Sequence, residues 1–591
     1  MSKKYQWDIF EKLLLILFVS GSLVFYGFLY NQHLCQSEQL QLFEVTPGYF
    51  IHKLSGPGGF ADWLGESMIQ FFHLPMAGAL IITGLCLFLW SLTRRILFGS
   101  GQNRIPIIFA FLPATGYWIL LMDPFYSVSG LAGLILSMLA SLVYTEIHGS
   151  AKRFLSGIIL LLLIYWLTGA AFIVFVSVVI ISELAWWLKK DDKSFSPFAV
   201  LFFLVLAFAI PLTARTFIFR DTLLQAYISE SYYKIRIFFP LPLILIFASM
   251  PLLILFRHLP WPVLSGKSGT TLSGTALLLL PALMITGIMV KGDFREEREI
   301  AYENLAYGGS WNKIIKRAER ERPSDKLSVT AVNLALAKTG KLSSKMFFFS
   351  QRRDNLFPGY SNRGRTPFIT SDVYYYAGLV NFAQMFALET IESTIDVKYP
   401  SRSFRRAAET FIINGQYEVA RKYLVPLSHT LFYGNWARNC LSLLGKEENI
   451  NADPYWGYMR GIRPKYDFFY NINEMDVALQ YLLVSNPDNK IAYEYLMALY
   501  LLGKNFDGFL QFLPLSEKYK YNGLPLAWQE AAAYIETRVN QVPQALANIE
   551  LSNDVIEHIR SYASAFKAER SDTLKMMKDF GNTYWFYLHY R

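Results

Sequence analysis

Cysteine and histidine are scarce in this sequence, and the few that occur are scattered. The three cysteines, Cys35, Cys86 and Cys440, form no CxxC motif, which excludes a disulfide framework and a cysteine-based metal site. The histidines of the second half lie far apart, and no H-E-x-x-H, G-x-S-x-G or Walker loop occurs between Gly292 and Arg591. We therefore expect no metal and no cofactor.

Charged residues are also sparse. They make up 17% of the chain, whereas 53% of it is apolar and 16% aromatic. This balance excludes an ordinary soluble protein with a single core. The net charge of +10 does not indicate nucleic acid, because the basic residues of the first half lie in short clusters between apolar runs, as topology signals do. We expect the lipid bilayer, and no nucleic acid, as a partner.

The apolar run from Thr271 to Val290, closed by Lys291, divides the chain. A run of about twenty apolar residues can cross the hydrocarbon core as one helix. Long apolar stretches precede this run, and the residues after it have the charge density of a water-soluble protein. The sequence thus predicts a transmembrane helical domain over residues 1–291 and an extracytoplasmic helical-repeat domain over residues 292–591.

Nine apolar stretches of the first domain are candidate transmembrane helices. They cover residues 13–30, 75–97, 105–122, 129–147, 152–167, 170–188, 197–213, 239–256 and 271–290. The first is long for a signal peptide and ends in Phe and Tyr residues rather than in the small residues of a cleavage site, so we expect it to be retained. Residues 152–188 can alternatively form one long tilted helix.

Basic residues predict the orientation of these helices. With nine spans, every inner-loop cluster, including Lys152–Arg153 and Lys189–Lys190, lies on the same side as Lys3 and Lys4. The positive-inside rule then places the N-terminus in the cytoplasm. Because the number of spans is odd, Lys291 and the second domain lie outside. We expect a multi-pass protein of the bacterial inner membrane with a periplasmic C-terminal domain.

The outer loops carry the candidate catalytic residues. Asp62 and Glu66 are four residues apart, on one face of a short helix expected to lie in the membrane interface. Asp123 follows in the second outer loop, and a third loop contains the arginines Arg215, Arg220 and Arg236. Glu146 and Glu183 lie near the cytoplasmic ends of their spans, where they can reach the interface.

This layout of outer-loop acids, later arginines and a soluble tail resembles that of the GT-C glycosyltransferases, which use polyprenyl-phosphate sugars. The resemblance implies that Asp62, Glu66 or Asp123 acts as a general base, and that an arginine of the third loop holds the lipid phosphate. The paired-acid signature of that superfamily is absent near Asp62. In the alternative interpretation, these acids and arginines are solvated surface residues.

The second domain shows the pattern of paired helices. A helix is expected over residues 301–318, and Pro323 separates it from another over 327–338 that closes at Gly340. Residues 404–427, 475–510 and 529–551 repeat a similar pattern, with small residues, aromatics and turn residues at corresponding places. A tetratricopeptide-type (TPR-like) repeat of roughly 34 residues has these features. The fold class is therefore all-α, a polytopic membrane domain followed by a TPR-like solenoid.

Several segments carry a resemblance to a known family. They are Asn333–Leu342, Arg405–Ala408 leading into Gly415–Leu424, and the Pro57–Gly59 loop before the second span. These segments resemble an uncharacterised bacterial family of polytopic inner-membrane proteins with a C-terminal helical-repeat domain, found in Gram-negative gut-type bacteria. The resemblance covers most of the chain and implies architecture only, since that family supplies no catalytic residues.

Two classes of function remain open from the sequence. One is an interaction protein of the cell envelope, whose TPR-like domain binds a protein or peptide partner. The other is an envelope glycosyltransferase of the GT-C type that uses a polyprenyl-phosphate-linked donor. A transporter is a weaker third option, because no span has a charge near its centre and no inverted repeat is visible.

Overall fold

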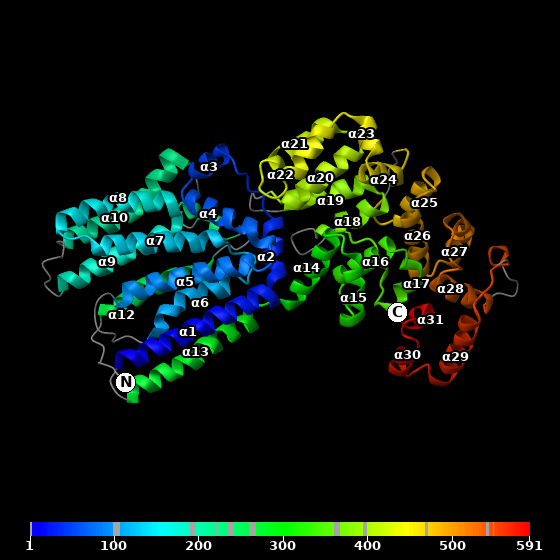
Figure 1. The fold of residues 1–591 in the computed structure, drawn as a ribbon, viewed down its shortest axis with the longest axis horizontal. Helices are drawn as coiled ribbons and strands as arrows, with labels where there is room; N and C mark the ends of the chain where they lie inside the picture. The colour runs from blue at the N-terminus through cyan, green and yellow to red at the C-terminus, as the bar shows by residue number, and fades with distance from the viewer. Residues whose placement is uncertain are drawn as a thin grey trace. The chain divides into compact units, whose positions relative to one another are not determined.

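In a computed structural model the chain is 80% helical, and its described residues contain no strand. The structure describes residues 3–98, 107–188, 197–219, 222–227, 229–233, 240–258, 267–359, 367–393, 399–466, 471–538, 543–547 and 549–591. The chain divides into two compact units (Figure 1). Among the described residues, the first comprises those up to residue 297 with a short later segment, 429–434, and the second comprises the rest.

The first unit consists mainly of long apolar helices. They are α1 (Lys3–Val24), which continues into η1 (Phe25–Leu29), α5 (Ala77–Phe98), η3 (Ile107–Phe111) with α6 (Leu112–Leu120), α7 (Val128–Glu146), α8 (Ser150–Thr168), α9 (Phe172–Leu188), α10 (Pro197–Ala214), α12 (Leu241–His258) and α13 (Lys267–Lys291). Shorter helices lie between them, namely α2 (Asn31–Gln39), α3 (Pro47–Leu54), α4 (Gly59–Ile69) and α11 (Leu223–Tyr227). Each of the nine predicted apolar stretches overlaps one of these helices.

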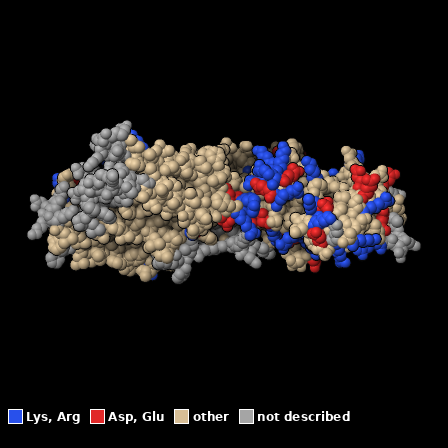
Figure 2. Space-filling view, turned by 90° about the horizontal axis from the view of Figure 1, so that it is seen from below, with Lys and Arg blue, Asp and Glu red and all other residues tan. Residues whose placement is uncertain are grey.

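Several of these helices can cross a membrane. Among the described residues, five helical segments are long and apolar enough, or six if a bent pair is counted as one span. Two shorter apolar helices, Ile108–Leu120 and Leu241–Phe256, add to them. On the face drawn in Figure 2, charged side chains are sparse over the first unit and dense over the second. A surface of this kind is stable against lipid, which indicates a membrane protein.

Residues 150–188 form a hairpin of two helices and not one long helix. The apolar segment Ser150–Leu188 is 39 residues long, and α8 ends at Thr168, just before Gly169, which has φ +54°. The Arg153 side chain, at the start of α8, bonds to Glu183 near the end of α9 at 2.7 Å. Ends that are 30 residues apart can meet only if the chain turns back, because a straight helix of that length spans about 45 Å.

The first and last long helices of this unit, α1 and α13, pack together, and hydrogen bonds connect the segments that follow them. α1 packs against α13 (Figure 1), and the chain bends by 70° between α13 and α14 (Phe294–Tyr307). Beyond the bend, the Glu297 carboxylate accepts hydrogen bonds from the backbone N–H groups of Gln32 (2.7 Å) and His33 (3.0 Å). These groups lie in the first turn of α2, where a helix has unpaired donors and a positive dipole end.

The second unit consists of consecutive short helices, most of which pack against the next one along the chain (Figure 1). They are α15 (Trp311–Glu321), α16 (Lys326–Lys338), α17 (Leu342–Lys345), α18 (Phe368–Ala377), α19 (Val380–Ser393), α20 (Ser401–Ile413), α21 (Tyr417–Ser428), α22 (Gly434–Leu443), α23 (Glu447–Ala452), α24 (Pro454–Ile462), α25 (Met475–Ser485), α26 (Lys490–Leu502), α27 (Phe506–Phe512), α28 (Leu526–Glu536), α29 (Asn553–Glu569), α30 (Thr573–Phe580) and α31 (Tyr584–Tyr590). Paired neighbours include α15 with α16, α20 with α21 and α25 with α26.

Local sequence signals explain most of these boundaries. Asn489 begins α26 because its side chain accepts a hydrogen bond from the Ala492 N–H at 2.9 Å, as an N-cap does. Gly340 and Gly415 end their helices with φ of +66° and +74°, which glycine adopts without strain. The prediction of one continuous helix over residues 301–318 is wrong, however, because Gly309, with φ +62°, separates α14 from α15.

Candidate functional site

The two acids predicted to be catalytic share one lysine. Lys53 Nζ, on α3, lies 2.6 Å from Asp62 Oδ2 and 3.0 Å from Glu66 Oε1, both on α4. The Tyr49 hydroxyl donates to Glu66 Oε2 at 2.7 Å, and Ser129 Oγ donates to Asp62 Oδ1 at 3.0 Å. The side chains of Asp62 and Glu66 are 9% and 2% exposed. We call Tyr49, Lys53, Asp62 and Glu66 the Lys53 cluster.

The packing of α4 explains the burial of this cluster. α4 packs against α7 and α8, with Gly59, Asp62 and Glu66 among its buried residues. Gly65 faces α7 so closely that a Cβ there would lie 2.6 Å from the Ser129 backbone nitrogen. The spacing of four residues places Asp62 and Glu66 on one face, as predicted, but that face turns inward.

Gly65→Ala is expected to destabilise the first unit by about 1–3 kcal/mol, because overpacking forces the two helices apart. Gly84→Ala on α5 is the matched control, since a Cβ there meets no atom within 4 Å. Thermal unfolding of the full chain in detergent measures both. A melting temperature for Gly65→Ala equal to that of Gly84→Ala would contradict the close contact between α4 and α7.

The electrostatics of the Lys53 cluster differ from those of a free general base. One ammonium group lies between two carboxylates, so both acids are held as ion-paired acceptors. Burial and the neighbouring Glu66 carboxylate raise the pKa of the Tyr49 hydroxyl far above its usual value, so Tyr49 stays a neutral donor. A general base must instead direct an available lone pair at the substrate proton. The cluster therefore resembles a structural ion network that fastens α3 to α4.

The other predicted site residues lie elsewhere in the structure. Asp123 Oδ2 lies 3.2 Å from Lys291 Nζ, at the end of α13, and its other oxygen accepts from the Phe125 N–H. Arg215 begins the short helix η5 (Arg215–Phe219). Arg220 and Arg236 lie outside the described residues. Asp123 is thus ion-paired with Lys291.

Two neighbouring aromatic residues, Tyr117 and Trp118, lie in the core of the first unit. Trp118 is fully buried, and its indole N–H donates to Ser22 Oγ on α1 at 2.9 Å. Tyr117 is also fully buried, and its hydroxyl donates to the Ser127 carbonyl at 3.3 Å. Trp63 packs against Phe50, with ring centroids 4.9 Å apart. Tyr117 and Trp118 thus fill the interior of the first unit.

A buried ion pair inside the apolar hairpin was not predicted. Arg153 and Glu183 are each 1% exposed, with Nε to Oε1 at 2.7 Å and Nη2 to Oε2 at 3.3 Å. The Tyr144 hydroxyl of α7 also donates to Glu183, at 2.8 Å. The prediction that Arg153 is a loop residue is therefore wrong, since Arg153 lies within α8. The pair satisfies both charges internally, because each group is the other's counter-ion.

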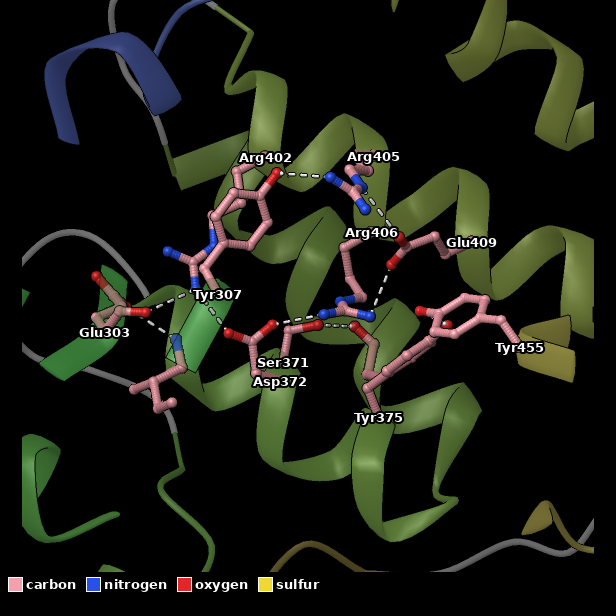
Figure 3. A network of polar contacts seen from close by, with 12 residues as sticks. Glu303, Tyr307, Ser371, Asp372, Tyr375, Arg402, Arg405, Arg406, Glu409 and Tyr455 are labelled. Carbon is pink, nitrogen blue, oxygen red and sulfur yellow. Dashed lines mark hydrogen bonds and ion pairs between the residues drawn. The ribbon is translucent and has the colours of Figure 1, made fainter. Parts of the chain in front are cut away.

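A larger polar network lies in the second unit (Figure 3). Asp372 on α18 accepts from Arg402 at 2.6 Å and from Arg406 at 2.7 Å, both on α20. Arg406 also donates to Glu409 at 2.7 Å, and Arg405 donates to the same carboxylate at 3.1 Å. We call these five residues the Asp372 network. It connects α18 to α20 with buried charge-assisted hydrogen bonds.

Aromatic rings surround this network. Arg402 lies over Tyr307 (4.3 Å from the ring centroid) and Arg406 over Tyr375 (3.7 Å). Burial alone would raise the pKa of Asp372, but Arg402 and Arg406 outweigh it and hold that pKa below the ordinary value of 3.8. Arg405 and Arg406 belong to a segment that carries the family resemblance. The sequence could not show that these arginines share a carboxylate. Asp372 lies about thirty residues before them, and helical spacing rules relate only residues three or four apart.

The comparisons with known proteins give the chain a family and no activity. No curated protein and no solved structure is significantly similar to it. One family model matches residues 5–591, which is almost the whole chain, and it is described as a family of unknown function. This agrees with the resemblance to an uncharacterised family drawn from the segments around Asn333 and Arg405. The all-helical chain, with its apolar first unit and its buried ion networks, belongs to the family of unknown function DUF6057.

Proposed function

We propose that this protein is a membrane-anchored binding protein of the bacterial cell envelope. The apolar helices of the first unit hold it in the inner membrane, and the second unit binds a protein or peptide partner. One observation carries the proposal. The predicted catalytic acids of the first unit form ion pairs with lysines: Asp62 and Glu66 with Lys53, and Asp123 with Lys291. Binding by the second unit is therefore the better-supported activity.

The second unit is suited to binding because its helix pairs repeat. We infer that these pairs form a TPR-like solenoid, since helix pairs that contact their neighbours are the building plan of such domains. Exposed apolar side chains also occur on it. On α25, Tyr481 and Val484 are 54% and 79% exposed, and residues three apart lie on the same helical face. Such a face favours contact with another protein.

Site-specific photo-crosslinking in cells tests this function. A photoreactive residue at Val484 is expected to yield one discrete protein adduct, and deletion of residues 298–591 should abolish the cellular phenotype. The control is the same residue at Val290 on α13, 72% exposed, which should crosslink to lipid. The absence of a protein adduct at both Val484 and Tyr481, together with a silent deletion, would refute the proposal.

We infer further that the chain crosses the membrane nine times, with its N-terminus in the cytoplasm and its second unit in the periplasm. The support is the agreement of the basic loop clusters with one orientation, and the hairpin α8–α9, which supplies two crossings. Alkaline phosphatase fused after Arg591 is expected to be active, and green fluorescent protein at that position dark. The reverse result would mean an even number of crossings.

A GT-C glycosyltransferase remains the alternative, favoured by the buried charges of the Lys53 cluster, which an anchor does not need. In that case Glu66→Gln or Asp62→Asn should reduce cellular activity about 10²–10⁴-fold at unchanged protein level, because a general base is lost. The binding proposal expects little change in activity at equal protein level. Glu146→Gln is a control outside the cluster. A large loss confined to the α4 variants would favour the transferase and a polyprenyl-phosphate donor.

A further inference from the structure

An aromatic surface with one unpaired cation lies on the second unit. Lys338 ends α16, and its ammonium lies 4.7 Å from the ring centroid of Tyr376 and 5.5 Å from that of Tyr458. Trp311, at the start of α15, packs edge-on against Tyr376 with centroids 5.4 Å apart. Tyr455 joins them from α24, where it and Tyr458 are 40% and 46% exposed. We call these five residues the Lys338 surface.

The charge of Lys338 is not compensated by the protein. Within the described part of the chain, neither a carboxylate nor another hydrogen-bond acceptor contacts its ammonium. The nearby acids belong to the Asp372 network, where they bind arginines. Lys338 is half-buried, and this burial lowers the pKa of its amine. A partly desolvated cation without a counter-ion is unfavourable, and a bound anion would relieve that cost.

The aromatic rings narrow the choice of anion. Tyr458 lies beside the ammonium, and Tyr455 is partly exposed on the same helix. Such rings gain free energy by packing against another apolar or aromatic body. A small hydrated anion would use the ammonium alone and leave the rings in water. An anion attached to an apolar group would use both. The carboxylate of a peptide, either a side chain or a C-terminus next to an apolar residue, has this chemistry.

We propose that the Lys338 surface binds a carboxylate of the protein partner, with Lys338 as its counter-ion and Tyr376, Tyr455 and Tyr458 packing against the adjoining apolar residue. This inference rests on the proposed binding function and names the chemical group recognised. Lys338 belongs to α16, Tyr376 to α18, and Tyr455 and Tyr458 to α24, so helices far apart in the sequence bring these side chains together. The site therefore exists only in the folded unit.

Protection of Lys338 from acetylation tests the site on the full chain in detergent. The probe is N-acetylphenylalanine, and its matched control is N-acetylphenylalanine amide, which lacks only the charge. We expect the acid to slow acetylation of Lys338, measured by mass spectrometry, and to bind about tenfold more tightly than the amide, because a hydrogen bond to a charged group is lost in the amide. Acetylation of the exposed Lys341 should not change. Equal protection by acid and amide, or none, would overturn the inference.

Two variants separate this inference from the proposed function. Tyr458→Ala, at an exposed position, should remove the protection of Lys338 by the acid without affecting folding. Lys338→Gln should remove the adduct expected from Val484 in cells. If the adduct persists in Lys338→Gln, the partner binds elsewhere and the inference fails while the proposed function stands. If the chain with Lys338 intact gives no adduct from Val484 either, the proposed function itself is refuted.

Discussion

Asp372→Asn is expected to destabilise the second unit by about 3–5 kcal/mol, because it leaves two buried arginines without their shared carboxylate. Arg402 and Arg406 are 3% and 9% exposed, so water cannot replace the lost charge. Hydrogen exchange of the full chain in detergent measures the effect locally. Amides of α18 and α20 should exchange at least about a hundredfold faster, since exchange reports the free energy of opening.

Glu418→Gln is the control for this variant. Glu418 and Arg421 also form an ion pair, but their side chains are 85% and 49% exposed, and exposed pairs contribute little. Exchange in α20 and α21 should therefore stay within experimental error of the unmodified chain. Equal exchange in the two variants would mean that the Asp372 network does not hold the unit together.

The same network predicts a dependence on pH with a definite sign. The pKa of Asp372 is lower in the folded protein than the ordinary value of 3.8, because Arg402 and Arg406 outweigh the effect of burial. A depressed pKa contributes stability that is complete above the ordinary value and is lost as the pH falls through the folded value. The contribution of Asp372 should thus be constant between about pH 5 and 8 and disappear only in strong acid.

The second large effect is expected in the membrane hairpin. Glu183→Gln leaves Arg153 charged and buried between apolar helices, which typically costs about 3–5 kcal/mol. The melting temperature of the full chain in detergent should fall accordingly. Removing both charges, in Arg153→Met with Glu183→Met, should restore much of that loss, because apolar residues of similar volume can replace a buried pair.

Lys152→Met is the control for the hairpin variants, since Lys152 neighbours Arg153 but is exposed. It should leave the melting temperature nearly unchanged. The double variant is the decisive measurement. If the double variant is less stable than Glu183→Gln, the ion pair stabilises the protein by more than the avoidance of an unpaired buried charge. The pair would then have a role besides joining α8 to α9.

The helices of this fold could be predicted from the sequence, whereas their side-chain partners could not. Apolar runs locate helices because their length and hydropathy are local properties. For the same reason Asn489 could be recognised as the start of a helix. The two-glycine break at Gly308–Gly309 was missed, because a pattern of apolar residues continues across it and only the backbone, with φ +62° at Gly309, shows the interruption.

Partners are non-local, which explains what was missed at the candidate site. The spacing of Asp62 and Glu66 correctly placed them on one helical face, but it could not show that Lys53 lies against that face. Arg153 was counted as a loop charge because Glu183 reaches it only across the hairpin. Acids in membrane loops are usually solvated. In this protein they are buried because α4 packs against α7 and α8.

The packing of α1 against α13 has a consequence for biosynthesis. α1 is made first, and its partner α13 is the last long apolar helix of the unit to be synthesised. At about 5–20 residues per second, the ribosome needs roughly a quarter of a minute to a minute to add the intervening chain. During that time the side of α1 that will contact α13 must be covered by lipid or by the insertion machinery. Glu297 emerges only afterwards, so its bonds to the first turn of α2 can form only once every membrane helix has left the ribosome.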